Sequence, residues 1–432
     1  MGDMFQNPPV KGNPWYMAMA KTVFPHNRPA GGVNGAIAKS VDLLRDMPRY
    51  ELTSLMRSRH DPIFQEAMTA LRDTTVAAPL TQQIVNRLQP LTGEDIAADA
   101  SWRFAPIGVI SNAERELFNK LQIEAFAVHF RRPILRWRRT LAPVFRPASA
   151  AEHEMLFRAE DNLHQLWVEG GPALLTENVA STRGVVNGTM AIMHHPVWVG
   201  GLPDVVSAAV NAALTSPQPV YVDVPTPAYV IMRIGNGGGQ NYRWHGSKLP
   251  DLDGRLPPLA SALEDPLQDD RDQLVALPYG GEPEKVTLRS AQALAQPRLE
   301  VQASAFAYSV AFALTDFKLQ GRTMSKLVLS LSPRDGVPQF TMQGVYVFLS
   351  RVCGFDGLRT IAATHDDVGR LKKLCYNPCL VAWNEGYVVP RGSDAGADTS
   401  CPKIFDPDKA RAAYGAFVTV RNDAAARAEP PT

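Results

Sequence analysis

The sequence predicts an α/β protein whose middle part is rich in β-strands, and three observations lead to this class. Residues 102–115 begin as an apolar strand and continue as a helix. Residues 311–321 begin as a buried strand and end in a polar turn. From residue 173 onward, short runs of β-branched and aromatic residues alternate with turn residues. Strands that lead directly into helices or ligand-holding turns are typical of α/β domains.

Helical patterns precede the first of these strands. After a Gly/Pro-rich loop to about residue 35, apolar residues recur at helical spacing through residues 41–56, and residues 80–99 read as short helices with turns. Ser111 and Glu114 form a capping-box pattern. This pattern predicts that a helix begins there and opens a second α/β domain.

Four β-strands are expected in the middle of the chain, at residues 174–178, 190–193, 220–224 and 229–232. The Asn187-Gly188 dipeptide between the first two is a hairpin signal. Residues 235–300 are polar and Pro-rich and read as a long loop with one or two strands. The last residues, 423–432, are predicted to be disordered.

Composition and charge are those of a soluble globular protein of two or three domains. The chain has 432 residues, of which 45% are hydrophobic and 20% charged. The net charge of +1 does not by itself indicate nucleic acid. No basic leader precedes an apolar stretch and no apolar run reaches 18 residues, so we expect no membrane partner and an intracellular location, the nucleus in a eukaryote.

A basic segment and a cysteine pair each leave two interpretations open. Residues 129–139 place five arginines around Trp137, which suits phosphates and stacked bases but equally suits a basic strand with Ile134, Leu135 and Trp137 in the core. Cys375 and Cys379 form a C-x₃-C pair. The pair could form half a zinc site with His365 and Cys401, although unpaired structural thiols are the favoured interpretation and no metal ligand is predicted.

Two segments in the last third of the chain carry the chemistry, and each has an ordinary reading as a solvated turn. In the first, residues 314–324, Thr315, Lys318, Gln320 and Gly321 follow a buried strand. In the second, residues 345–352, an apolar stretch ends in Ser350-Arg351. A guanidinium presented from a packed element suits phosphate, because its planar fork stays charged and donates two hydrogen bonds at once.

The pair of segments resembles motifs V and VI of PIF-type superfamily-one DNA helicases, which are relatives of RecD. Motif V of that family usually reads Thr-x-His-Lys-Ser-Gln-Gly-x-Thr, and the chain has Phe317 in place of His and Leu319 in place of Ser. Motif VI usually reads Tyr-Val-Ala-Leu-Ser-Arg-Val, and only Phe348 departs from it.

The start of the chain carries further likeness to this family. Residues 2–10 read Gly-Asp-Met-Phe-Gln-Asn-Pro-Pro-Val and resemble motif III, whose Gln, here Gln6, senses the γ-phosphate. Residues 51–57 resemble the segment whose closing arginine, here Arg57, reaches the same phosphate, and Asp61 to Phe64 continue the likeness. The sequence of residues 102–115 resembles the corresponding region in helicases of Helitron-type transposons.

The resemblance implies a fold: a RecA-like helicase domain with an inserted small β-barrel, preceded by the trailing part of a first RecA-like domain. Residues 184–188, Gly-Val-Val-Asn-Gly, match the stretch that marks the barrel in the family. The implied bounds are 1–95 for the first RecA-like remnant, 96–172 with 296–362 for the second RecA-like domain, 173–295 for the barrel and 363–432 for an extension.

The resemblance also implies a function. The chain would be the C-terminal part of an ATP-dependent 5′-to-3′ DNA helicase that translocates on single-stranded DNA. The family acts in DNA repair and recombination. Gln6, Arg57 and Arg351 would face the γ-phosphate of ATP bound with Mg²⁺. The residues expected to couple that site to DNA are Thr315, Lys318, Gln320 and Gly321.

A P-loop ending in Gly-Lys-Ser/Thr and an acidic pair for Mg²⁺ do not occur in the sequence. In the family both lie upstream of motif III, so a missing N-terminal half is a possible partner. We expect the chain alone neither to bind ATP and Mg²⁺ tightly nor to hydrolyse ATP or unwind DNA. The alternative is a catalytically inactive helicase remnant that acts as a nucleic-acid-binding or interaction module, which the replacements Phe317, Leu319 and Phe348 would favour. No Gly-x-Ser-x-Gly or His-Glu-x-x-His motif supports an unrelated hydrolase.

Overall fold

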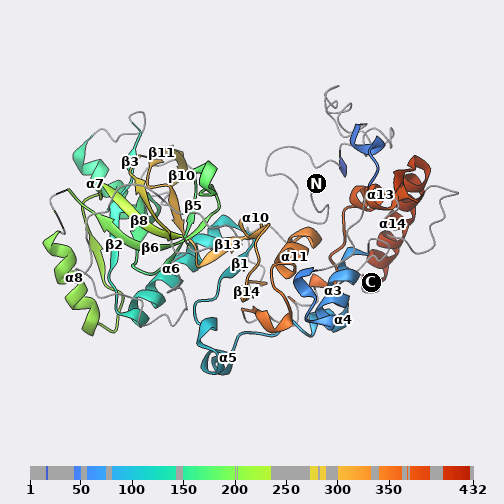
Figure 1. Ribbon diagram of the computed structural model, residues 1–432, viewed down its shortest axis with the longest axis horizontal. Coiled ribbons are helices and arrows are strands. Elements are labelled where there is room, and N and C mark those ends of the chain that lie inside the picture. Colours follow the sequence, from blue (N-terminus) through green and yellow to red (C-terminus); the bar gives the residue numbers. More distant parts are fainter. Residues whose placement is uncertain are drawn as a thin grey trace. The chain divides into compact units, whose positions relative to one another are not determined.

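The computed structural model describes residues 16–17, 43–49, 56–73, 80–142, 149–199, 201, 203–234, 273–280, 283–288, 300–331, 340–361, 367, 370–389 and 402–428. The chain divides into two compact units (Figure 1). The first unit combines Met1–Glu114 with Leu314–Thr432, and the second is Arg115–Ala313. Each unit is described by itself. Gln6 lies outside the described residues, so its predicted role stays a prediction.

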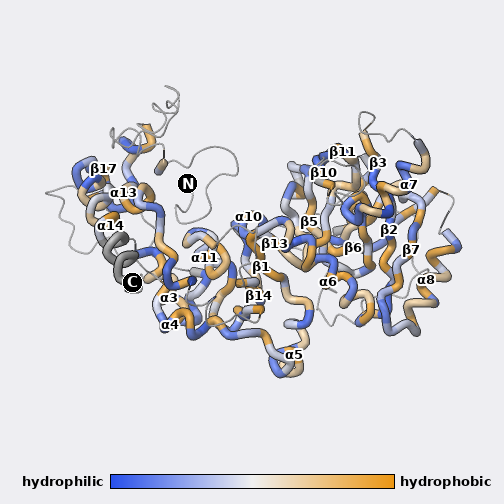
Figure 2. The backbone as a smooth tube through the Cα atoms, turned by 180° about the vertical axis from the view of Figure 1, so that it is seen from behind, coloured by the Kyte–Doolittle hydropathy of each residue, from blue (hydrophilic) through white to orange (hydrophobic). Residues whose placement is uncertain are grey.

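A four-stranded sheet is the centre of the first unit. Its strand order is β13-β1-β14-β15, with bounds Ala313–Thr315, Ile107–Val109, Leu327–Leu329 and Leu358–Thr360. β14 pairs in parallel with both β1 and β15. Figure 2 labels β1, β13 and β14 on the backbone coloured by hydropathy, and all three strands are buried at every residue. Parallel strands buried on both faces are typical of α/β domains, so the predicted class is confirmed.

The described helices of the first unit are mostly short, apart from α14 with its 22 residues. They are η2 (Met56–Ser58), α3 (Pro62–Arg72), α4 (Gln82–Val85), α5 (Gly93–Ala98), η3 (Ala100–Trp102), α10 (Asp316–Leu319), α11 (Met342–Leu349), η8 (Phe355–Gly357), α13 (Pro378–Glu385) and α14 (Pro407–Ala428). In α3, Asp61 caps the first turn and Pro62 occupies its first position. The buried residues follow at helical spacing and are Phe64, Ala67, Met68 and Leu71.

The end of the chain corrects one expectation. The helix α14 continues to Ala428, so the prediction of disorder from residue 423 is wrong for residues 423–428. The segment is rich in alanine and arginine, which are strong helix formers, and this propensity outweighs its polar composition. Near the start of α14, the two-stranded pair β16 (Tyr387–Val388) and β17 (Ile404–Phe405) places Phe405 against Tyr387 and Trp383, with ring centroids 5.2 and 5.8 Å apart.

The helix α6 (Asn112–Phe130) links the two units in sequence and begins as predicted. Ser111 N donates to Glu114 Oε2 at 3.4 Å, and Glu114 N donates to Ser111 Oγ at 3.1 Å, which confirms the capping box. Further along α6, Asn119 accepts from Ala313 N at 2.7 Å and donates to Val310 O at 2.9 Å.

The second unit consists mainly of antiparallel strands. Its five-stranded sheet has the order β12-β5-β6-β8-β9, with bounds Tyr308–Val310, Pro172–Leu175, Met190–Val197, Tyr229–Ile234 and Gln273–Pro278. Two three-stranded sheets accompany it: β10-β11-β3 (Glu284–Thr287, Glu300–Ser304, Thr140–Leu141) and β4-β2-β7 (His164–Trp167, Ile134–Arg138, Tyr221–Asp223). Its helices are α7 (Ala150–Ala159), η5 (Asp161–Leu163), η6 (Ser181–Arg183) and α8 (Asp204–Thr215). The strands predicted in this region are present, while closure into a barrel and the implied domain bounds stay predictions.

A buried glutamine joins the aromatic core of the second unit. The Gln165 side chain accepts from Trp137 Nε1 at 3.2 Å and from Phe306 N at 3.0 Å. Its amide nitrogen donates to Phe306 O at 3.0 Å and to Tyr308 O at 3.1 Å. A buried amide costs free energy unless it is hydrogen-bonded, so this network fixes how these strands meet.

The Asn-Gly turn forms between two strands that pair antiparallel, as the hairpin signal predicted. Thr189 N donates to Val186 O at 2.9 Å, and Gly188 has a φ of 93°. Strands β5 and β6 do pair antiparallel, but the connection between them also contains η6, so the turn does not join the strands directly.

Candidate functional site

The predicted motif V segment forms a buried strand, one turn of helix and a left-handed glycine. β13 ends at Thr315, α10 follows, and Gln320 N donates to Asp316 O at 3.0 Å. Gly321 has a φ of 82°, a conformation that a side chain would strain. Arg322 N then donates to Leu319 O at 3.1 Å. After this turn the chain continues towards the next strand, β14.

The predicted motif VI segment is the helix α11 and the residues after it. All eight residues of α11 are buried, and Thr341 caps the helix by accepting from Gly344 N at 3.0 Å. The helix ends at Ser350, and Arg351 follows with only 2% of its surface exposed.

Arg351 holds the two segments together. Its Nε donates to Val347 O at 2.9 Å and to Ser350 Oγ at 3.1 Å, and its Nη1 donates to Arg322 O at 3.3 Å. Its own carbonyl accepts from Met324 N at 2.8 Å. A guanidinium at the C-terminal end of a helix also interacts favourably with the helix dipole.

Arg57 reaches the same place from the first part of the chain. Its Nε donates to Thr323 Oγ1 at 2.9 Å, and its Nη1 donates to Ser350 O. The two arginines that the sequence predicted as phosphate contacts, Arg57 and Arg351, therefore meet at Ser350. We call this group, made of Arg57, Arg322, Thr323, Ser350 and Arg351, the arginine cluster.

The cluster concentrates positive charge. Arg322 is half-buried, and burial lowers the pKa of its guanidinium. Within the described part of the first unit, neither Arg57 nor Arg322 forms an ion pair with a carboxylate. Guanidinium groups gathered in this way suit an anion with several oxygens, such as a phosphate chain.

The other predicted site residues take different positions. Lys318 is connected to the cluster through its backbone, because Arg322 Nε donates to Lys318 O at 2.7 Å. Thr315 is buried, whereas Gln320 and Gly321 are exposed. The described hydrogen bonds bring Arg57 and Arg351 together at Ser350 and do not join Thr315 or Gln320 to these arginines, and the phosphate and DNA roles of all these residues stay predictions. Arg322 was not among the predicted site residues, because it stands at a variable position of motif V.

Two of the three departures from the family motifs are accommodated by packing. Phe348 is 1% exposed, and a Cβ on Gly108 would come within 2.8 Å of its ring. Phe348 therefore occupies space that a glycine leaves open. Leu319 is fully buried at the end of α10. Phe317, by contrast, is 42% exposed where the family has a histidine.

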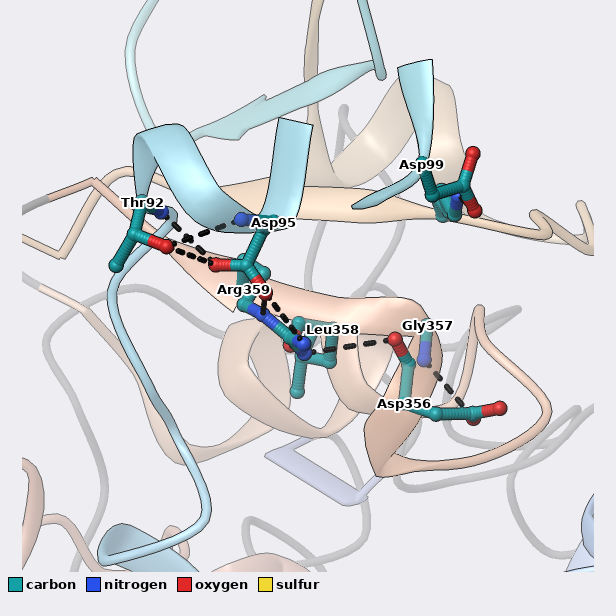
Figure 3. A network of polar contacts seen from close by, with 8 residues as sticks. Thr92, Asp95, Asp99, Asp356, Gly357, Leu358 and Arg359 are labelled. Atoms are coloured by element: carbon teal, nitrogen blue, oxygen red, sulfur yellow. Dashed lines mark hydrogen bonds and ion pairs between the residues drawn. The ribbon is translucent and has the colours of Figure 1, made fainter. Parts of the chain in front are cut away.

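A separate acidic network contacts β15 and the residues before β14, and Figure 3 shows its Asp95–Arg359 part. Asp95 accepts from Arg359 Nε at 3.1 Å and from Arg359 Nη2 at 2.9 Å, and it completes a capping box with Thr92. Asp99 pairs with Lys326. Hydrogen bonds from Arg359 lower the pKa of Asp95 to about 2, and the bond from Lys326 does the same for Asp99.

These two cations also enclose an aromatic ring. Lys326 Nζ lies 4.9 Å and Arg359 Cζ 5.0 Å from the ring centroid of Trp102. Cation–π contacts of this kind add to the ion pairs. The positive charges near Trp102 therefore stabilise the fold through these ion pairs and ring contacts.

The basic segment at residues 129–139 is a paired strand. The five-residue strand β2 places Ile134, Leu135 and Trp137 in the core. Its arginines are matched by acids: Arg136 with Asp223 at 2.6 Å, Arg138 with Glu154 at 2.7 Å, Arg139 with Glu284 at 3.2 Å, and the preceding Arg132 with Glu169 at 3.3 Å. The interpretation of this segment as a basic strand with its apolar residues in the core is confirmed. Because these four arginines are paired with acids, their charges are not available to a phosphate.

A small cavity in the second unit has a volume of about 30 Å³. Its walls are mostly apolar, and the Arg132–Glu169 pair forms its polar edge; the lining residues are Arg132, Pro133, Leu135, Trp167, Glu169, Pro196, Trp198 and Val206. Such a volume suits one or two water molecules. It is too small for a nucleoside.

Metal and membrane features were sought in the described residues. No group of three or more His, Cys, Asp or Glu side chains lies close enough there to hold a metal ion. His365 and Cys401, the proposed partners of Cys375 and Cys379, lie outside the described residues. None of the described helices combines the length and apolar character needed to cross a bilayer.

Comparisons with known proteins give structural likeness only. No protein-family profile matches the chain, and no curated protein matches it. Among solved structures, the Pif1 helicase from Candida albicans shares 16% identity over 75% of this chain and 57% of its own length, with a TM-score of 0.39. The Pif1 helicase from Bacteroides in complex with ADP-AlF3 and ssDNA shares 15% identity over 89% of this chain and 65% of its own length, with a TM-score of 0.44.

A Bacteroides Pif1 bound to ssDNA gives the same identity and TM-score, over 66% of its length. The chain thus resembles Pif1 helicases in structure and spans about three fifths to two thirds of their length. The Helitron subgroup stays a prediction.

Proposed function

We propose that the chain carries the arginine-bearing part of an ATP-dependent 5′-to-3′ DNA helicase, in which ATP hydrolysis drives movement along single-stranded DNA. The observation that supports this most is the arginine cluster. Arg57 and Arg351, 294 positions apart in the sequence, meet at Ser350 beside the motif V turn. A shared phosphate contact gives a reason for two arginines to converge in this way.

In this proposal the cluster binds the outer phosphates of the nucleotide, with Gln6 approaching the same group. The guanidiniums would stabilise the negative charge that develops as the terminal phosphate is transferred. Single-stranded DNA would be contacted by Lys318, Gln320, Thr315 and the turn at Gly321. These residues would couple the nucleotide state of the cluster to DNA binding. Mg²⁺ would accompany ATP in the complete motor.

The phosphate part of the proposal is tested with inorganic tripolyphosphate as the probe. Isothermal titration of the full chain should show salt-sensitive binding, and Arg57→Ala should weaken it about tenfold, the usual loss for one charge-assisted contact. Arg138→Ala is the matched control, because this arginine is paired with Glu154 in the other unit. Equal affinity in the two variants would contradict a phosphate role for the cluster.

The DNA part is tested with oligodeoxythymidine. We expect binding that weakens with salt, and a further loss in Lys318→Ala but not in Lys285→Ala, whose ammonium pairs with Glu300 in the second unit. No salt-sensitive binding at all would contradict the DNA role.

A second candidate, an inactive remnant that binds nucleic acid or a partner, is favoured by one observation. Phe317 exposes an aromatic ring in the turn where the family has a histidine. DNA binding without tripolyphosphate binding would support this candidate over the helicase proposal. An exposed ring can still stack on a base, so replacement of Phe317 by Ala should then reduce DNA binding.

A further inference from the structure

Asp61 lies outside the arginine cluster, yet its carboxylate connects the two segments that build the cluster. We propose that Asp61 is a positioning residue that sets Arg57 against Ser350 and Arg351. The proposal rests on the function proposed above for the cluster, and it concerns how the guanidiniums are held, not which ligand they bind.

The two oxygens of Asp61 serve different parts of the chain. Oδ1 accepts from Phe64 N at 2.9 Å and caps α3. Oδ2 accepts from Phe355 N at 3.2 Å, across 294 positions of sequence. An N-cap needs only one oxygen, so the second bond is an additional contact between distant segments.

Two contacts therefore join the same two stretches of chain. At one end Arg57 donates to Ser350 O, and at the other Asp61 accepts from Phe355 N. Four positions separate Arg57 from Asp61, and five separate Ser350 from Phe355. The Asp61 contact is thus a second tie between these two stretches, beside the contact that Arg57 makes.

The connection between the two contacts is short and stiff. Asp61 N donates to Ser58 O at 3.0 Å, which closes the turn that follows η2. On the other side, the rings of Phe64 and Phe355 meet edge to face with centroids 4.9 Å apart. A shift of Asp61 would therefore move Arg57, because little in the connection can absorb it.

Gly354 provides a steric counterpart to the carboxylate. A Cβ at Gly354 would lie 2.8 Å from Asp61 Oδ2 and 2.8 Å from Asp356 Oδ1. Side chains do not reach such distances without a shift of their neighbours. The close approach of the backbone at residue 354 is what allows Asp61 to reach Phe355 N.

The experiment uses the full chain labelled with ¹⁵N-arginine, and it follows the Nε–H signal of Arg57, assigned by its absence in Arg57→Lys. The variants are Asp61→Ala, Asp61→Asn, Gly354→Ala and the double variant Asp61→Ala/Gly354→Ala. Thr81→Ala is the matched control, since Thr81 caps α4 in the same unit by accepting from Ile84 N and contacts no arginine of the cluster.

We expect Asp61→Ala and Gly354→Ala each to move the Arg57 signal and to speed its hydrogen exchange about tenfold, as the loss of one hydrogen bond predicts. Asp61→Asn, with one carbonyl oxygen for two amides, should fall between Asp61→Ala and the unaltered chain. Because part of the steric conflict of Gly354→Ala is with Asp61 Oδ2, the double variant should be less perturbed than the sum of the two single variants.

Tripolyphosphate affinity is measured in parallel and should fall about fivefold in Asp61→Ala but not in Thr81→Ala. An Arg57 signal that Asp61→Ala leaves unchanged, or moves no more than Thr81→Ala does, would overturn the positioning role. If the unaltered chain binds no tripolyphosphate but the Arg57 signal responds as described, the phosphate function fails and the positioning role stands.

Discussion

Arg57 Nε donates to Thr323 Oγ1 across 2.9 Å, although the two residues are 266 positions apart in the sequence. The same guanidinium also donates to the carbonyl of Ser350. One side chain thus contacts both segments that the sequence singled out, motif V and motif VI.

Replacing Thr323 by valine tests this contact. The change keeps the shape of the side chain and removes the acceptor, so we expect a loss of about 1 kcal/mol in the free energy of unfolding. Urea denaturation measures it, and Thr419→Val is the control, since its hydroxyl bonds only within α14. A loss no greater than in the control would show that the Arg57 contact contributes little.

A double-mutant cycle tests the packing of Phe348 on Gly108. Gly108→Ala should cost about 1–3 kcal/mol by overpacking, and Phe348→Ala about 3–5 kcal/mol by leaving a cavity. Because the added methyl group enters the space that the ring vacates, the double variant should be less destabilised than the sum of the two. Simple additivity in guanidinium denaturation would contradict the proposed fit.

The acidic network predicts how stability depends on acid pH. Hydrogen bonds from Arg359 hold the pKa of Asp95 at about 2, below its ordinary value of 3.8. The unfolded chain therefore binds this proton first, so the stabilisation is present above about pH 4 and is lost as pH falls towards 2. Asp95→Asn should flatten the dependence of the unfolding midpoint on pH in this window, whereas Asp408→Asn, an exposed acid of α14, should not.

Glu169 predicts the opposite trend at higher pH. Burial raises its pKa from 4.5 to about 7, although the nearby Arg132 acts in the other direction. A raised pKa means that the folded state binds the proton more tightly. The contribution is present below about pH 4.5 and is lost as pH rises through 7. Thermal unfolding between pH 5 and 8 should show this decline in the unaltered chain and a smaller one in Glu169→Gln. An identical slope in both would contradict the assignment.

The sequence predicted the local elements well where their signals are local. The capping box at Ser111 and Glu114 and the buried strand before Thr315 are each specified by a few adjacent residues. The convergence of Arg57 and Arg351 was also expected, but only through the resemblance to a helicase family, since periodicity does not state which distant segments meet.

The predictions that were missed or left open depended on distant partners. The arginines of residues 129–139 looked available for phosphates until the fold placed acids beside them, and those acids lie as far as 145 positions away in the sequence. The end of α14 was missed because its polar composition suggested disorder while its alanines favour helix. From the sequence, Phe348 was only a departure from motif VI, because its packing partner, Gly108, lies far away in the sequence on β1.

The contacts at Ser350 and Phe355 affect the order in which the protein folds during synthesis. They join residues separated by 293 and 294 positions, with the second unit between them in the chain. During synthesis, Arg57 and Asp61 leave the ribosome long before the residues that complete their contacts. Contacts of such high sequence separation are slow to form because a long loop must first close. The second unit is a continuous stretch and can fold first, whereas the arginine cluster can assemble only after both outer segments have been synthesised.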